Sequence, residues 1–175
     1  SFPAPLPEPP VKEWATRANA ESRENVVCSI FLEHDALEQQ NIKLQEKYKV
    51  IEENEVMYEE FLVDDAKMVV VAYGIVSRVL RSAVRLARAE GVPVGLLRPI
   101  SLWPFPKKRL EELANSHVER LACFELSNGQ MLEDVRLAVH DNIPVDFYGR
   151  MGGNVPSPEE CVEVIKRFAA EGGLL

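Results

Sequence analysis

The sequence predicts a three-layer α/β/α fold with a five-stranded, mostly parallel but mixed sheet. Short apolar runs alternate with segments of helical spacing from residue 68 onward, and parallel strands require helical crossovers of this kind. The chain has 175 residues and is 46% apolar and 27% charged, which is enough apolar material for one globular domain. A proline-rich stretch at the start predicts a separate leading segment.

Residues 1–23 are predicted to be an interdomain linker. The first ten residues alternate proline with other residues, and they lack an initiator Met and the basic and apolar regions of a secretory signal. Alternating prolines favour polyproline II, which acts as a semi-rigid spacer. We therefore expect Ser1 to be a cut end that another domain precedes. The alternative is an unstructured tail of a complete protein.

Residues 24–175 are predicted to form the α/β domain, which begins with a strand and a long helix. Residues 25–32 are β-branched, as in a buried strand. Asp35 followed by Glu38 resembles a capping box, and apolar side chains every seven residues predict a helix over residues 36–62. These side chains are Leu37, Leu44, Ile51 and Tyr58. So narrow a stripe packs against one neighbour, either its own domain or another chain.

Three βα units follow, each with a short apolar strand and a helix of 3.6-residue spacing. The strands are expected over residues 68–73, 94–98 and 121–125, and the helices over residues 77–90, 107–115 and 131–139. A last strand is expected over residues 145–148. The final helix begins at Ser157 as N-cap, with Pro158 at N1 and Glu160 at N3, and it ends at Gly172.

Charge and cysteine content exclude several classes of function. The 20 Lys and Arg residues against 28 Asp and Glu residues give a net charge of −8, which repels nucleic acids and anionic membrane surfaces. The longest apolar run, residues 68–73, is far shorter than the ~20 residues of a membrane span. Cys28, Cys123 and Cys161 lie too far apart in the sequence for a metal motif. We expect three buried thiols, no metal site, and a reducing, cytoplasmic compartment.

Candidate binding residues stand where the predicted parallel strands end, because open α/β sheets bind ligands outside the carboxyl ends of their strands. The candidates are Gly74, Ser77, Arg98, Glu125, Asn128, Gln130 and Arg150. We expect them to contact a partner subunit or a substrate-side ligand. No residue is predicted to be catalytic, because a lone Glu125 without a histidine partner is a weak acid/base signal.

Two of these regions leave alternatives open. Gly74 and Ser77 at a helix N-terminus could hold a carboxylate or phosphate, or Gly74 only makes a tight turn and Ser77 only caps the helix. Just one glycine of the dinucleotide-binding GxGxxG pattern is present, so tight nucleotide binding is disfavoured. The rigid loop with Trp103 and Phe105 is a lid, an interface anchor or a plug of the core.

Several stretches, in this order, resemble the α subunit of 2-oxoacid:ferredoxin oxidoreductases, in its C-terminal part. They are VAYGIVS at 71–77, LWPFP at 102–106, ELSNGQMLEDVR at 125–136, and FYGRMGG with PSPEE at 147–160. The stretch 37–65 resembles the branched-chain type, which acts on 3-methyl-2-oxobutanoate (2-oxoisovalerate). The resemblance implies a transketolase C-terminal-like domain whose first strand is antiparallel at one edge of the sheet, which residues 25–32 would form.

The resemblance also implies a reaction. Such enzymes decarboxylate a 2-oxoacid oxidatively with thiamine diphosphate and Mg²⁺, transfer the acyl group to coenzyme A, and pass electrons through iron–sulfur clusters to ferredoxin. This chain has neither the GDG motif for Mg²⁺ and pyrophosphate nor grouped cysteines. We therefore expect a non-catalytic domain that binds no cofactor alone and contacts other subunits or a second copy of itself. The alternatives are a free-standing module for an anionic metabolite and a pure assembly domain.

Overall fold

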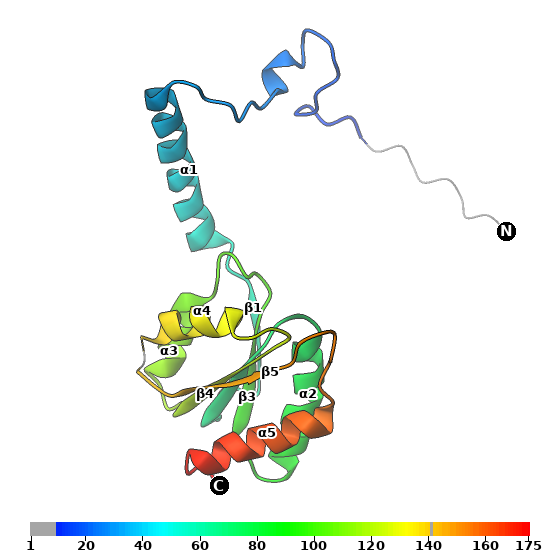
Figure 1. Cartoon of the computed structure of the whole chain (residues 1–175), viewed down its shortest axis with the longest axis vertical. Helices are drawn as coiled ribbons and strands as arrows, with labels where there is room; N and C mark the ends of the chain where they lie inside the picture. Colours follow the sequence, from blue (N-terminus) through cyan, green and yellow to red (C-terminus); the bar gives the residue numbers. More distant parts are fainter. Residues whose placement is uncertain (1–9, 141) are drawn as a thin grey trace, which may run out of the picture. The chain divides into compact units, whose positions relative to one another are not determined.

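Five strands pair in the order β1-β3-β2-β4-β5 (Figure 1). Strands Met68–Val71 (β2), Val94–Pro99 (β3), Arg120–Glu125 (β4) and Val145–Gly149 (β5) run parallel to one another. Strand Tyr58–Phe61 (β1) pairs antiparallel with β3 at the edge. The predicted five-stranded mixed sheet is therefore confirmed.

This computed structural model describes residues 10–140 and 142–175. The chain divides into two compact units, Ser1–Lys47 and Tyr48–Leu175. The linker predicted over residues 1–23 falls partly outside the described residues, and its role stays a prediction. None of the helices in the described ranges combines the length and the apolar character that crossing a bilayer requires.

Helices cover both faces of the sheet in the second unit (Figure 1). Helices Gly74–Ala89 (α2) and Pro158–Glu171 (α5) pack against each other on one face. Helices Lys107–Ala114 (α3) and Gln130–Val139 (α4) pack against each other on the other face. The three βα units and the final helix thus have the predicted order, and their bounds differ from the predicted ones by a few residues.

The central strands are buried on both faces, which explains their unbroken apolar sequences. Met68 and Val70 join the core under α2 and α5, whereas Val69 and Val71 join the core under α3 and α4. Successive side chains of a strand point to opposite faces, so a strand covered on both sides needs apolar residues at every position. Each fully buried aliphatic side chain contributes roughly 1.5–3 kcal/mol.

The start of the last helix confirms a local prediction. The Ser157 hydroxyl accepts a hydrogen bond from the backbone N–H of Glu160 at 3.1 Å, and Pro158 occupies the first helical position. The serine satisfies one of the helix's free backbone donors. Proline lacks a backbone N–H, which costs no hydrogen bond at the first helical position, because an N–H there has no acceptor within the helix. These three residues alone were enough to place the helix start.

The strand predicted over residues 25–32 is wrong. The structure has a short 3₁₀ turn at Arg23–Asn25 (η1) and no strand in this stretch. Val27 and Leu32 are 93% and 86% exposed. A β-branched run favours a strand only where a neighbouring strand and a core can receive it, so strand propensity alone misled here.

The helix predicted over residues 36–62 is too long. Helix His34–Asn54 (α1) begins before Asp35, which therefore lies in the first turn and is not the N-cap. The helix ends at Asn54, and Tyr58 belongs to β1 instead. All residues of α1 lie in the described part of the chain, and none of their side chains is buried. The apolar repeat of seven residues extends into the edge strand, where β3 supplies the hydrogen bonds.

Candidate functional site

The chain leaves the central strands toward opposite faces at the carboxyl edge of the sheet. After β2 the chain passes to the face that α2 covers. Strands β3 and β4 flank β2 in the sheet, and after each of them the chain passes to the opposite face, which α3 and α4 cover. Such divergence is where open α/β sheets form their ligand crevices. We call the segments that follow the four parallel strands, residues 72–77, 100–106, 126–130 and 150–156, the carboxyl-end rim.

Glu125, at the end of β4, is buried and bonded to its own chain. Its carboxylate accepts hydrogen bonds from the Ser127 hydroxyl at 2.7 Å and from the backbone N–H groups of Met131 and Leu132 at 2.9 and 3.3 Å. A negative charge at the N-terminus of α4 is also favoured by the helix dipole. Beside it, a Cβ at Gly149 would stand 2.5 Å from the Ser127 carbonyl oxygen. Glu125 therefore fixes the loop after β4 and is not exposed to a partner.

Ser77 is also buried rather than exposed on the rim. Its hydroxyl donates to the Gly74 carbonyl at 2.8 Å, and the N-cap of α2 is Tyr73. Ser77 is thus not the cap that the sequence suggested. Gly74 has φ +58° with open space around its missing side chain, so its backbone conformation is what favours glycine there. Gly74 therefore fits the alternative in which it makes a tight turn between β2 and α2.

Arg150, after β5, is half-buried and held by Glu160 of α5. Its guanidinium donates to the Glu160 carboxylate at 3.1 Å, and its backbone N–H donates to the Glu125 carbonyl at 3.0 Å. The Tyr148 hydroxyl donates to the same Glu160 oxygen. This hydrogen bond, with Arg150 beside it, lowers the pKa of Glu160. Burial, and then Glu160, raise the pKa of Tyr148.

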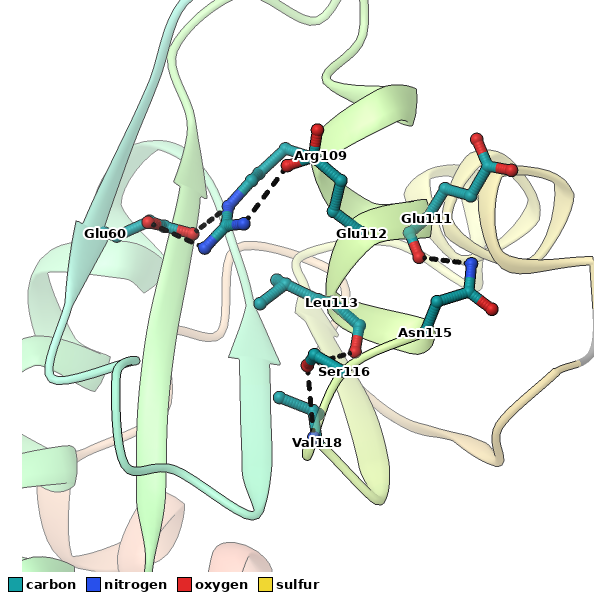
Figure 2. A network of polar contacts seen from close by, with 8 residues as sticks. All are labelled: Glu60, Arg109, Glu111, Glu112, Leu113, Asn115, Ser116 and Val118. Carbon is teal, nitrogen blue, oxygen red and sulfur yellow. Dashed lines mark hydrogen bonds and ion pairs between the residues drawn. The ribbon is translucent and has the colours of Figure 1, made fainter.

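Two arginines connect the edge strand β1 to the rest of the sheet. Arg98 of β3 pairs with Glu59 at 2.9 Å, and its Nε is buried and has no hydrogen-bond partner among the residues that the structure describes. On the other face, Arg109 of α3 pairs with Glu60 at 2.7 Å and with Glu112 at 3.2 Å, as Figure 2 shows. The Glu60 hydrogen bond holds the pKa of Arg109 above its ordinary value. Sequence reasoning missed this network, because it placed Glu60 in a helix.

The aromatic loop after β3 has one exposed and one buried ring. Phe105 is 7% exposed and packs in the core under α3 and α4, so it plugs the core and cannot anchor an interface. Trp103 is 55% exposed, with its ring edge-on to Tyr48 at 5.4 Å between centroids. A groove of about 610 Å³ lies beside the loop, and Trp103, Lys107 and Asp134 are among its lining residues. Trp103 remains an interface candidate.

Exposed apolar side chains from all four segments gather on the carboxyl-end rim. They are Ile75, Ile100, Leu102, Trp103, Leu126, Met151 and Val155. Asn128 and Gln130 are exposed beside them in the loop after β4. Exposed apolar side chains among uncharged polar ones are typical of the central part of a protein interface. The structure thus brings Asn128, Gln130 and Trp103 to one exposed edge, while it buries Ser77, Phe105 and Glu125 beneath it.

The cysteines differ from one another in their surroundings. Cys123 and Cys161 are buried, as expected, and burial raises the pKa of both thiols, that of Cys161 to about 12. Cys28 is exposed, which contradicts the expectation that it is buried, because the strand predicted around it does not form. Within residues 10–140 and 142–175, no group of three metal-binding side chains stands together.

Comparisons with known proteins agree on one family. The family model of the pyruvate:ferredoxin oxidoreductase core domain II matches residues 66–161. The ketoisovalerate oxidoreductase subunit VorB of Methanothermobacter thermautotrophicus is 53% identical over 162 residues, which are 93% of this chain and 46% of that protein. The 2-oxoglutarate synthase subunit KorA of Methanothermobacter marburgensis is 34% identical over 58% of this chain and 27% of its own length. The chain spans about half the length of the VorB relatives that it matches.

Solved structures share the fold. A 2-oxoglutarate:ferredoxin oxidoreductase from Magnetococcus marinus, with 2-oxoglutarate, coenzyme A and succinyl-CoA bound, matches with a TM-score of 0.67 at 22% identity, over 78% of this chain and 24% of that one. An inactive β4 tetramer of a split-gene transketolase matches with a TM-score of 0.52 at 18% identity, over 63% of this chain and 40% of that one. The transketolase-like fold is therefore confirmed.

Proposed function

This chain belongs to the pyruvate:ferredoxin oxidoreductase core domain II family, and from this premise we propose that it is a non-catalytic domain of a 2-oxoacid:ferredoxin oxidoreductase of the ketoisovalerate type. The observation that carries the proposal is the 53% identity to VorB over 93% of the chain, against 34% over 58% for a KorA subunit. The chain would be the C-terminal domain of the subunit that corresponds to α, in a cytoplasmic enzyme.

The domain's role is to contact other subunits through the carboxyl-end rim. The exposed apolar side chains of the rim support this, since water-exposed apolar surface on four loops is stabilised when a partner covers it. The residues beneath the rim are bonded to the chain itself, so the loops keep their shape before a partner binds. An interface that is already ordered loses less conformational entropy on association.

Redox and decarboxylation chemistry belong to other parts of such a complex. The chain's cysteines do not fit an iron–sulfur cluster, because Cys123 and Cys161 lie on opposite faces of the sheet. The Glu125 carboxylate accepts four hydrogen bonds from its own chain, so it is not free to act as a general base. Thiamine diphosphate, Mg²⁺, the clusters and the sites for coenzyme A and ferredoxin are therefore proposed to lie elsewhere in the complex.

Substrate-dependent activity of the assembled enzyme tests the enzyme class. The full-length protein is purified with the subunits that accompany it, and viologen reduction is measured with 3-methyl-2-oxobutanoate, pyruvate and 2-oxoglutarate. We expect the highest kcat/KM with 3-methyl-2-oxobutanoate, and dependence on coenzyme A. Faster turnover of either other acid would contradict the substrate assignment, and no reduction with any of the three would contradict the enzyme class.

Two matched leucines test the role of the rim. Leu102 on the rim and Leu137 on α4 are 48% and 62% exposed. We expect Leu102→Asp in the full-length protein to weaken subunit association at least about tenfold, because a charge would be buried in the interface. Leu137→Asp should leave association within about twofold, because Leu137 lies outside the rim. Size-exclusion chromatography and light scattering measure both. Equal behaviour of the two variants would contradict the proposed interface.

A further inference from the structure

Helix α2 carries four arginines and no acidic residue in a chain whose net charge is −8. The arginines are Arg78, Arg81, Arg85 and Arg88, and their spacing of three and four places them along one side of the helix. Arg88 is held by Asp65 at 2.6 Å. Within the described residues, Arg78, Arg81 and Arg85 form no ion pair. Uncompensated positive charge on this side of α2 is therefore a local exception to the acidic surface.

A small hollow of about 130 Å³ opens between this helix and the strands β1 and β3. It is lined by Glu59, Glu60, Phe61, Ser77, Arg78, Arg81, Leu96 and Arg98. The Arg81 guanidinium stacks over the Phe61 ring at 4.5 Å, which limits its freedom to swing into solvent. Arg98 uses only its Nη1 on Glu59, and within the described part of the chain its Nε has no hydrogen-bond partner. Guanidinium donors from two elements thus border one hollow.

The charges around the hollow do not balance. Glu60 is paired with Arg109 on the other face of the sheet, which leaves Glu59 as the carboxylate facing Arg78, Arg81 and Arg98. The hollow therefore has an excess of two positive charges. A carboxylate would neutralise one of them, whereas a phosphate group carries about two negative charges near neutral pH. The balance favours phosphate over a carboxylate.

Size and donor geometry agree with the charge. One water molecule occupies about 30 Å³ of liquid, so the hollow has room for a phosphate group but not for a nucleotide. The planar guanidinium presents paired N–H groups that match the oxygens of phosphate. We propose that this hollow binds a phosphate group through Arg78, Arg81 and Arg98, either as free phosphate or as a phosphomonoester. This inference does not depend on the proposed enzymatic function.

Titration of the full-length protein with inorganic phosphate tests the site, with ³¹P NMR and calorimetry as readouts. A phosphomonoester, glycerol phosphate, forms a second arm at the same ionic strength, and acetate a third. We expect saturable binding of at least one of the two phosphates and at least tenfold weaker binding of acetate. The tighter of the two phosphates identifies the source. Equal binding of acetate, or no saturable binding of either phosphate, would overturn the proposal.

Two neighbouring arginines of α2 provide the matched variants. Arg81 and Arg85 both lie over the Phe61 ring, at 4.5 and 5.2 Å, but only Arg81 lines the hollow. We expect Arg81→Gln to weaken phosphate binding at least tenfold and Arg85→Gln to change it less than twofold. Arg78→Gln, an exposed substitution, gives a second loss of at least fivefold in a protein whose circular dichroism is unchanged. Losses as large for Arg85→Gln would refute the site, because they would show only a general charge effect.

Discussion

The loops that follow β3 and β4 start at the same edge of the sheet, yet they use their side chains in opposite ways. The loop after β4 is closed on itself, since Glu125 accepts hydrogen bonds from Ser127 and from the first turn of α4. The loop after β3 exposes Leu102 and Trp103 and buries Pro104, Phe105 and Pro106. The buried carboxylate of one loop therefore holds that loop in place, whereas the exposed apolar side chains of the other loop provide surface for a partner.

This difference shows that position at a strand end does not by itself make a residue functional. The carboxyl edge of an α/β sheet collects polar residues partly because the helix that follows needs its first N–H groups satisfied. Glu125 does this for α4, so its charge serves the fold. Among residues 10–140 and 142–175, the Trp103 side chain forms no hydrogen bond, and it remains more than half exposed. A large ring kept in water is better explained by a partner than by the domain alone.

Removing the two rings of the loop after β3 should have unequal effects on folding. We expect Phe105→Ala to lower the free energy of unfolding by about 3 kcal/mol, because it leaves a cavity in the core. Trp103→Ala should lower it by less than about 1 kcal/mol, because the ring is mostly exposed and contacts Tyr48 only along its edge. Urea unfolding measures both. A larger loss for Trp103→Ala would mean that this ring, too, belongs to the core.

The loop after β4 should depend on its buried carboxylate. We expect Glu125→Ala to lower the free energy of unfolding by about 2 kcal/mol, because it leaves backbone N–H groups of α4 without their acceptor. The matched control is Glu133→Ala, since Glu133 is an exposed acid in the first turn of the same helix. It should cost less than about 0.5 kcal/mol. Equal losses in the two variants would show that only the helix dipole matters.

The fold was predictable where local signals agree with the tertiary structure. Continuous apolar runs marked β2 and β4, and Ser157 with Pro158 marked the start of α5. The edge strand was not predictable, because Tyr58–Phe61 contains two glutamates and continues a helical repeat. It becomes a strand through hydrogen bonds with β3 and ion pairs to Arg98 and Arg109. Residues 25–32 show the converse, a strand-like sequence without a strand to pair with.

The location of the candidate site was predictable, but the exposure of its members was not. The rule for open α/β sheets selects the carboxyl edge from the order of elements alone. Whether Glu125 turns inward depends on the turn at Ser127 and on where α4 begins, because these set whether the hydrogen-bond donors lie within reach of the carboxylate. Asn128 and Gln130 follow the same strand and point outward into solvent. Sequence spacing does not distinguish these positions.

The carboxylate that holds the end of β5 should give the smallest effect, and one that depends on pH. Glu160 accepts from Tyr148 and Arg150, and its side chain is 33% exposed. We expect Glu160→Gln to lower the free energy of unfolding by about 1 kcal/mol at pH 7, a modest value because solvent screens the pair. Circular dichroism during urea unfolding measures the difference.

The sign of the pH dependence follows from the Tyr148 hydrogen bond, which lowers the pKa of Glu160 below its ordinary value of 4.5. A carboxylate with a lowered pKa stabilises the folded state above that ordinary value and loses this contribution as the pH falls through the folded-state pKa. The difference between wild type and Glu160→Gln should therefore shrink steadily below pH 4.5. Tyr148→Phe removes the donor, so the pKa of Glu160 should move back toward 4.5 and the pH range over which the stability difference is lost should become narrower. A difference that stays constant from neutral to acid pH would mean that Glu160 does not hold the end of β5, and that this strand end is as free as the loop after β3.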